Sequence, residues 1–185
     1  CALVLGSGLS KPYGQGKKVG VILHQRSSHL QNALFNNALG LDTGKKGSDI
    51  LEEGRKQLSL SYPDVTVLEK EKVVSIKNTE EVYTVETNKK IYQSKIVVVA
   101  LNYAKPFTIK GLEQFIEPHQ RANPAKDRIQ LKNNNHLIQE GLYACGTIAG
   151  WRSQFAIAAG SGASVATDIL TLWNSGIPTK VHDKI

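Results

Sequence analysis

The sequence is poor in sulfur. Its 185 residues include two cysteines and no methionine. Because Cys1 and Cys145 lie far apart in the chain, the sequence excludes a Cys-x-x-Cys redox pair and a disulfide framework. This cysteine usage predicts a cytoplasmic protein, in which Cys145 is a buried and inert thiol. Since no methionine opens the chain, we expect the natural N-terminus to lie upstream.

Signals for membranes and nucleic acids are also missing. No apolar run reaches membrane-spanning length, and no signal peptide is visible. The formal net charge of +7 comes largely from scattered lysines, such as Lys17–Lys18 and Lys45–Lys46, with no arginine–aromatic stripe among them. We therefore expect a protein that binds neither membrane nor nucleic acid. Its basic surface favours an anionic cofactor or an acidic protein partner.

Patterns of metal and hydrolytic sites are absent as well. The five histidines show no metal-ligand spacing, and we expect them at the surface or in loops. They are His24, His29, His119, His136 and His182. Neither a Gly-x-Ser-x-Gly motif nor a Ser-His-Asp order occurs. The segment 160–163 lies inside a helical pattern, so its serine is predicted to serve helix packing.

The most informative stretch lies near the end of the chain. Leu142 to Cys145 is predicted to form a short buried strand, Gly146 a turn, and Gln154 to Trp173 a helix rich in alanine and glycine. A strand that turns at glycine toward a helix directs backbone N–H groups at one point, which suits a phosphate. The small residues of the helix would let another backbone or a flat ligand approach closely.

This stretch, Gly-Leu-Tyr-Ala-Cys-Gly-Thr from Gly141 and then a small-residue helix after Gln154, resembles the C-terminal flavin segment of one family. That family is the thioredoxin-reductase-like, FAD-dependent pyridine nucleotide-disulfide oxidoreductases. The resemblance implies that Gly146 and Thr147 contact the pyrophosphate or ribityl part of FAD. Where the family has Asp, this chain has Thr147. Its hydroxyl can still hydrogen-bond a phosphate or a hydroxyl without adding negative charge.

The same resemblance places the start of the last helix near the isoalloxazine ring. The residues concerned are Gln154, Phe155 and Ala156. A backbone N–H at a helix N-terminus there would stabilise negative charge on the reduced flavin. For Trp151 two interpretations stay open, stacking on the flavin or packing in the core.

The beginning of the chain has two interpretations. Ala2 to Ser10 could be a first strand that leads into a Gly-x-Gly turn. Only Leu9 to Lys18 would then remain for a crossover to the next strand, which is too short and contains Pro12 and two glycines. We therefore favour Cys1 to Gly8 as the end of the family's first helix. The first strand and the Gly-rich phosphate loop would then precede residue 1.

Val19 to Leu23 is predicted to be a parallel strand covered on both faces. It is followed by His24, Gln25 and Arg26, where FAD- and NAD-binding folds usually carry a carboxylate for the adenosine ribose. Gln25 could replace the ribose bond and Arg26 could meet a phosphate. Both could equally be solvated loop residues.

The middle of the chain predicts a surface helix with a serine N-cap, a strand, and an antiparallel three-stranded β-meander followed by an apolar strand. The ranges are Ser48 to Leu58, Val65 to Leu68, Glu71 to Lys77, Glu81 to Thr87, Ile91 to Lys95 and Ile96 to Leu101. The order resembles the family's middle section, which adds Lys72 and Val73 to the implied FAD contacts.

After the apolar strand the chain departs from the family again. The family has Ala-Thr-Gly near FAD, and this chain has Ala100, Leu101 and Asn102. The family then inserts an NADPH-binding domain. Here Tyr103 to Gln139 holds a proline-punctuated connector and one short strand, Arg128 to Leu131, which leaves no room for a second doubly wound domain.

The sequence thus predicts a single α/β domain over residues 1–185, a Rossmann-like FAD/NAD(P)-binding three-layer fold with a parallel sheet and a β-meander. The implied function is that of a minimal flavoprotein, an oxidoreductase or electron carrier. Its electrons would come from a redox partner protein or a freely docking NAD(P)H. The alternative is a non-catalytic nucleotide-binding or protein-interaction module that kept the fold. A homodimer is compatible with either.

Overall fold

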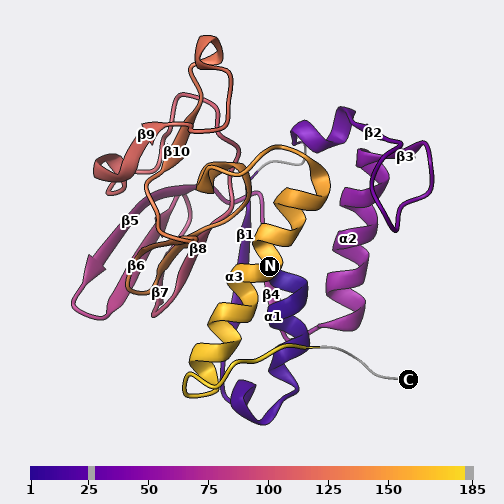
Figure 1. Ribbon diagram of the computed structural model, residues 1–185. Coiled ribbons are helices and arrows are strands. Elements are labelled where there is room, and N and C mark those ends of the chain that lie inside the picture. The colour runs from indigo at the N-terminus through magenta and orange to yellow at the C-terminus, as the bar shows by residue number, and fades with distance from the viewer. Residues whose placement is uncertain (25–27, 182–185) are drawn as a thin grey trace. The chain divides into compact units, whose positions relative to one another are not determined.

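The computed structural model describes residues 1–24 and 28–181 (Figure 1). The chain divides into two compact units, which are described separately. The first unit comprises Cys1–Lys70 and the segment from Ala166 onward, and the second comprises Glu71–Val165. Helix α3, Phe155–Trp173, contributes its beginning to the second unit and its end to the first.

The first unit is built on two parallel strands and its helices. Strands β1 (Val19–Leu23) and β4 (Val65–Glu69) pair in parallel with Val19 opposite Val65. The remaining elements are α1 (Ala2–Leu9), η1 (Pro12–Gly14), η2 (His29–Asn32), β2 (Leu34–Phe35), β3 (Lys45–Lys46) and α2 (Gly47–Ser61). The β2–β3 hairpin is antiparallel.

Helix α1 confirms the helical interpretation of the N-terminal segment. Gly8 fits a close helix contact, because a Cβ there would collide with the side chain of Leu170 from α3.

Two expectations for this unit are wrong. In β1 only Val19 is buried and Gly20 is exposed, so the strand is not covered along its length. Helix α2 takes Lys46 as its N-cap, and the Ser48 hydroxyl donates to Asp49 instead.

The second unit contains the predicted β-meander, which Figure 1 shows as three adjacent strands. They are β5 (Val73–Thr79), β6 (Val82–Thr87) and β7 (Ile91–Ser94), paired in that order and antiparallel. A second sheet has the order β11–β12–β8, formed by Leu137–Gln139, Leu142–Ala144 and Val97–Val99. Strands β8 and β12 are parallel, with Val99 opposite Ala144.

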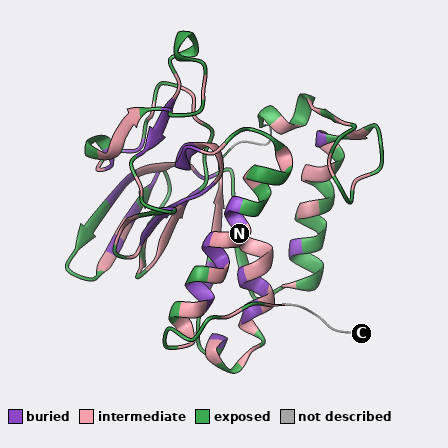
Figure 2. Ribbon diagram, viewed as in Figure 1, coloured by how far each residue is buried: buried purple, intermediate pink, exposed green. Residues whose placement is uncertain are grey.

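The connector between β8 and β11 is more ordered than expected. It contains η3 (Glu113–Phe115), β9 (Ile116–Pro118), η4 (Pro124–Lys126) and β10 (Ile129–Leu131). Strands β9 and β10 pair antiparallel. The side chains of Leu131, Leu142 and Ile148 are fully buried, and Figure 2 shows the buried positions in purple. The fold is therefore α/β with parallel and antiparallel sheets, as predicted.

Helix α3 is long and apolar enough, by length and composition, to cross a membrane. The expectation that no segment reaches that length is wrong by this criterion. However, Val165, Ala166, Ile169 and Leu170 are each at most 1% exposed. These residues belong to the buried third of the helix, 33% of its apolar window, and the other positions are exposed or half-buried.

Gly141 precedes β12 and provides a test of this fold. Its φ is +73°, and a Cβ there would lie 2.5 Å from the Lys95 carbonyl oxygen and 2.9 Å from the Tyr83 ring. We expect Gly141→Ala to lower the free energy of unfolding by about 2–4 kcal/mol, through left-handed backbone strain and overpacking. Urea denaturation measures this loss.

The matched control is Gly54→Ala in α2, where a Cβ would meet no atom within 4 Å. Because alanine is the better helix former, this variant should be about 0.5–1 kcal/mol more stable. Equal stability of both variants would contradict the backbone constraint assigned to Gly141.

Candidate functional site

The structure brings together two groups of predicted site residues that are distant in sequence. Ala100 to Asn102 follow β8, and Gly146 and Thr147 follow the parallel strand β12. The Cys145 N–H donates to the Val99 carbonyl at 3.0 Å, which extends the pairing to the strand ends. The Thr147 hydroxyl then donates to the Leu101 carbonyl at 3.3 Å. Both groups therefore lie at the carboxyl edge of the same parallel pair.

The turn after β12 runs from Gly146 to Gly150. Residues 146–149 form the 3₁₀ helix η5, and the φ of Gly146 is +72°, in the left-handed region that favours glycine. A Cβ on Gly146 would meet no atom within 4 Å. The space beside Gly146 is thus open, and the backbone conformation, rather than crowding, is what requires glycine there.

Three carbonyl groups of this turn are held by side chains of the connector. His119 bonds the Thr147 carbonyl through Nε2 at 3.0 Å, Asn133 donates to the Ala149 carbonyl at 3.2 Å, and Arg121 donates to the Gly150 carbonyl at 2.9 Å. His119 Nδ1 accepts the backbone N–H of Arg121 at 3.1 Å, so in the neutral ring Nε2 carries the proton that it donates to Thr147. We call these three hydrogen bonds from His119, Asn133 and Arg121 the clamp, and no pattern in the sequence predicted them.

The Gly146 N–H is also held. It donates to the Ser161 hydroxyl at 2.8 Å, and the same hydroxyl lies 2.9 Å from Nε2 of His136. This N–H is one of those expected to point at a phosphate, and in the structure it points to Ser161 instead. The assignment of Ser161 to internal packing is consistent with its burial, at 6% exposed.

Two of the histidines lie in loops, as one of the two expected placements had it, but they are buried rather than at the surface. His119 is 8% exposed and His136 is 3% exposed. The His136 ring stacks on Trp151 with a centroid distance of 5.6 Å and an interplanar angle of 23°. The Arg121 guanidinium lies 4.8 Å from the centroid of the Trp151 ring. Trp151 therefore packs against the protein's own side chains.

The start of α3 presents its polar residue to solvent. Gln154 and Ala156 are exposed and Phe155 is half-buried. The Gln154 carbonyl accepts the Ala158 N–H, so the helical hydrogen bonds begin at this residue. The first N–H groups of a helix have no partner within the helix, and they carry the positive end of its dipole.

The remaining predicted contacts belong to both units. Lys72 and Val73 stand at the start of the meander, where the Lys72 N–H and carbonyl both bond Asn88. His24 is exposed at the end of β1, in the first unit. Gln25 and Arg26 lie outside the described residues. The structure thus brings the ends of β8 and β12 together. The FAD contacts assigned to Lys72, Val73 and His24 stay predictions.

Cys145 directly follows β12, and its side chain is buried. Burial raises the pKa of the Cys145 thiol, because an apolar surrounding disfavours the thiolate. The predicted burial of Cys145 is confirmed, and a thiol that stays protonated is a poor nucleophile. Among residues 1–24 and 28–181, no cluster of potential metal ligands is found.

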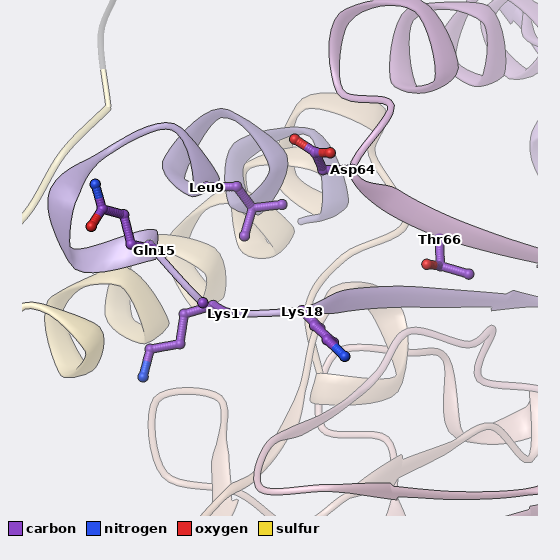
Figure 3. Close-up of a pocket in the computed structure, with 8 residues that line it drawn as sticks. Leu9, Gln15, Lys17, Lys18, Asp64 and Thr66 are labelled. Carbon is purple, nitrogen blue, oxygen red and sulfur yellow. The ribbon is translucent and has the colours of Figure 1, made fainter.

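A hollow of about 500 Å³ lies in the first unit (Figure 3). Leu9, residues 14–18, Asp64 and Thr66 line it. Lys17 and Lys18 precede β1 and Asp64 precedes β4, so the hollow lies at the amino ends of these parallel strands. Ligands of open α/β sheets bind outside the carboxyl ends, and this hollow does not fit that position.

No known protein-family profile and no curated protein matches this chain. Several solved structures share its fold. A thioredoxin reductase from Gloeobacter violaceus aligns over 100% of this chain and 95% of its own, with a TM-score of 0.73 and 12% identity. The atypical thioredoxin reductase from Desulfovibrio vulgaris Hildenborough aligns over 96% and 95%, with a TM-score of 0.69 and 10% identity.

A ferredoxin-flavin thioredoxin reductase from Clostridium acetobutylicum gives a TM-score of 0.66 and 13% identity, over 94% of this chain and 93% of its own. The chain therefore has the thioredoxin-reductase fold, an FAD/NAD(P)-binding α/β class, as the sequence resemblance implied. At these identities the likeness establishes the fold and leaves the activity to be argued from the site.

Asn133 tests whether the clamp holds the turn. Its amide donates to the carbonyls of Leu131 and Ala149, and its Oδ1 accepts the His136 N–H. We expect Asn133→Ala to lower the free energy of unfolding by about 1–3 kcal/mol, because backbone groups lose their partners in a partly buried place.

Asn134→Ala is the matched control, since Asn134 is exposed and its backbone pairs with Leu137. It should change stability by about 0.5 kcal/mol or less. Urea denaturation compares the two, and equal losses would contradict the clamp.

Proposed function

We propose that this chain is an FAD-binding minimal flavoprotein, an oxidoreductase or electron carrier that lacks its own NADPH domain. The observation that carries the proposal is the meeting of Ala100–Asn102 with Gly146 and Thr147 at the carboxyl ends of β8 and β12. Open α/β sheets bind their ligands at this edge. The thioredoxin-reductase fold of the chain supports the same conclusion.

The residues at this edge fit a dinucleotide with a flat ring. The space beside Gly146 is open, so a ligand can approach the backbone there. Leu101 is 45% exposed, although it is a large apolar side chain directly after a strand. Ile157, in the first turn of α3, is 37% exposed. Exposed apolar side chains beside an open turn are what an aromatic ring system would cover.

The roles of individual residues follow from their contacts. Because the Thr147 hydroxyl donates its proton to the Leu101 carbonyl, its lone pairs remain for a ligand donor, such as a ribityl hydroxyl. Gln154 and the N–H groups at the start of α3 would hold the edge of the ring and favour negative charge on it. FAD, when bound, would supply the redox chemistry.

The source of electrons is part of the proposal. The connector between β8 and β11 is filled by two short strands and two 3₁₀ helices, so we assign reduction to a redox partner protein or a freely docking NAD(P)H. A cytoplasmic location and a single functional domain over residues 1–185 remain predictions from the sequence.

One observation favours the alternative, a non-catalytic nucleotide-binding or interaction module that kept the fold. The Gly146 N–H is taken up by Ser161 within the protein, and Thr147 stands where the family has a carboxylate. A chain that has lost its cofactor would satisfy its backbone groups internally in this way.

Absorption spectroscopy separates the two functions. The protein is expressed from its complete reading frame, purified and saturated with FAD. Flavin bands at about one FAD per chain after gel filtration are expected under the main proposal. A colourless protein that ignores added FAD would overturn the main proposal and favour the alternative. Bleaching of the bands by NADPH or NADH without air would show direct reduction, whereas bands that only a partner protein bleaches would identify an electron carrier.

Gln154 gives a residue-level test. If it holds the ring edge, Gln154→Ala should weaken FAD binding about tenfold and leave the unfolding midpoint unchanged, because the side chain is exposed. Gln93→Ala, at an exposed position on β7, is the matched control. Fluorescence titration with FAD measures both. Equal affinities of the two variants would show that the ring edge has been assigned to the wrong residue.

A further inference from the structure

A buried hydroxyl–imidazole pair lies beneath the turn that follows β12. The Ser161 hydroxyl oxygen is 2.9 Å from Nε2 of His136, and it accepts the Gly146 N–H at 2.8 Å. Ser161 is 6% exposed and His136 is 3% exposed. The pair therefore links helix α3 to the turn through groups that are shielded from water.

The serine makes an uncommon contact for its position. Within a helix, a serine hydroxyl commonly bonds a carbonyl one turn earlier in the same helix. Ser161 instead bonds a backbone N–H 15 residues earlier in the chain, outside its own helix. This hydrogen bond is therefore a tertiary contact, and it orients the peptide group between Cys145 and Gly146.

His136 is itself fixed on several sides. Its N–H donates to Asn133 Oδ1 at 3.0 Å, and its carbonyl accepts the Ala144 N–H at 2.9 Å. Its ring stacks on Trp151. Because Ala144 is the last residue of β12, the backbone of His136 is hydrogen-bonded to the strand that carries the turn. The imidazole that contacts the Ser161 hydroxyl therefore stands on backbone fixed to this strand.

We propose that His136 and Ser161 are positioning residues for the cofactor, which rests on the FAD binding proposed above. The pair holds the Gly146 N–H inward while His119 holds the Thr147 carbonyl. The two tied groups belong to the peptides on either side, Cys145–Gly146 and Thr147–Ile148, so the Gly146–Thr147 peptide is held between two fixed neighbours and the Thr147 side chain keeps one direction. The turn is then ordered before the ligand arrives, so that binding loses little conformational entropy.

The test compares three serine variants of the protein expressed from its complete reading frame. Ser161→Ala should weaken FAD binding about tenfold in a fluorescence titration, since one hydrogen bond that orders the turn is lost. Ser161→Thr keeps the hydroxyl and should restore binding to within about threefold of the original protein. Ser164→Ala, on the same helix and half-buried, is the matched control and should bind FAD normally.

A second readout needs no cofactor. Amide hydrogen exchange of Gly146, followed by NMR in the FAD-free protein, should be faster in Ser161→Ala than in Ser164→Ala, because its N–H has lost its acceptor. His136→Leu should act like Ser161→Ala, and His136→Gln should restore protection. A glutamine amide can turn either its oxygen or its nitrogen toward the hydroxyl.

The outcomes separate the two proposals. If the original protein binds FAD and Ser161→Ala binds it equally well, the positioning role is overturned and the proposed function stands. Unchanged Gly146 exchange in Ser161→Ala would overturn the positioning role in the same way. If the original protein ignores FAD, the proposed function is overturned and the positioning role with it. Weaker binding together with faster exchange, both rescued by Ser161→Thr, would establish the role.

Discussion

The parallel pairing of β8 with β12 is the constraint on which the candidate site depends. Each strand has three residues, and the pairing is bracketed by the bond from the Val97 N–H to the Gly141 carbonyl at 2.8 Å and the bond from the Cys145 N–H to the Val99 carbonyl at 3.0 Å. Parallel strands end at the same edge of a sheet. This pairing alone brings Leu101 next to Thr147, 46 residues further along the chain.

The turn at that edge is not part of a β-sheet, so several of its backbone groups take side chains as their hydrogen-bond partners. A backbone group left without a partner in a partly buried place is costly, and the chain avoids this with His119, Asn133, Arg121 and Ser161. Three of these residues come from the connector between β8 and β11. The connector therefore does more than join two strands, because it fixes the shape of the turn.

Two of the departures from the thioredoxin-reductase pattern lie next to each other. The Thr147 hydroxyl replaces a carboxylate, and it donates to the carbonyl of Leu101, which replaces another residue of the pattern. A carboxylate at position 147 would have no proton to donate to that carbonyl. The bond uses the backbone carbonyl of position 101, which any residue there would offer, so it depends on the hydroxyl at position 147 and not on the leucine side chain.

Local sequence patterns determined the elements of this protein. The alternation of apolar and polar residues over 71–95 predicted the meander. The apolar run Ile96 to Leu101 predicted β8, and the Gly-Leu-Tyr-Ala stretch predicted β12 and the turn after it. These features depend on side-chain periodicity and on glycine, which act between neighbours in the chain. The N-terminal helix followed from chain length, because a crossover did not fit before Val19.

Only the tertiary structure decided which polar groups meet. The burial of His119 and His136, the bond between Ser161 and Gly146, and the clamp by Asn133 join residues that no spacing rule connects. In the sequence these residues lie in a polar connector and a small-residue helix, both typical of solvated or packed positions. Hydrogen bonds between distant segments depend on how those segments pack, and packing is a property of the whole chain rather than of any stretch of it.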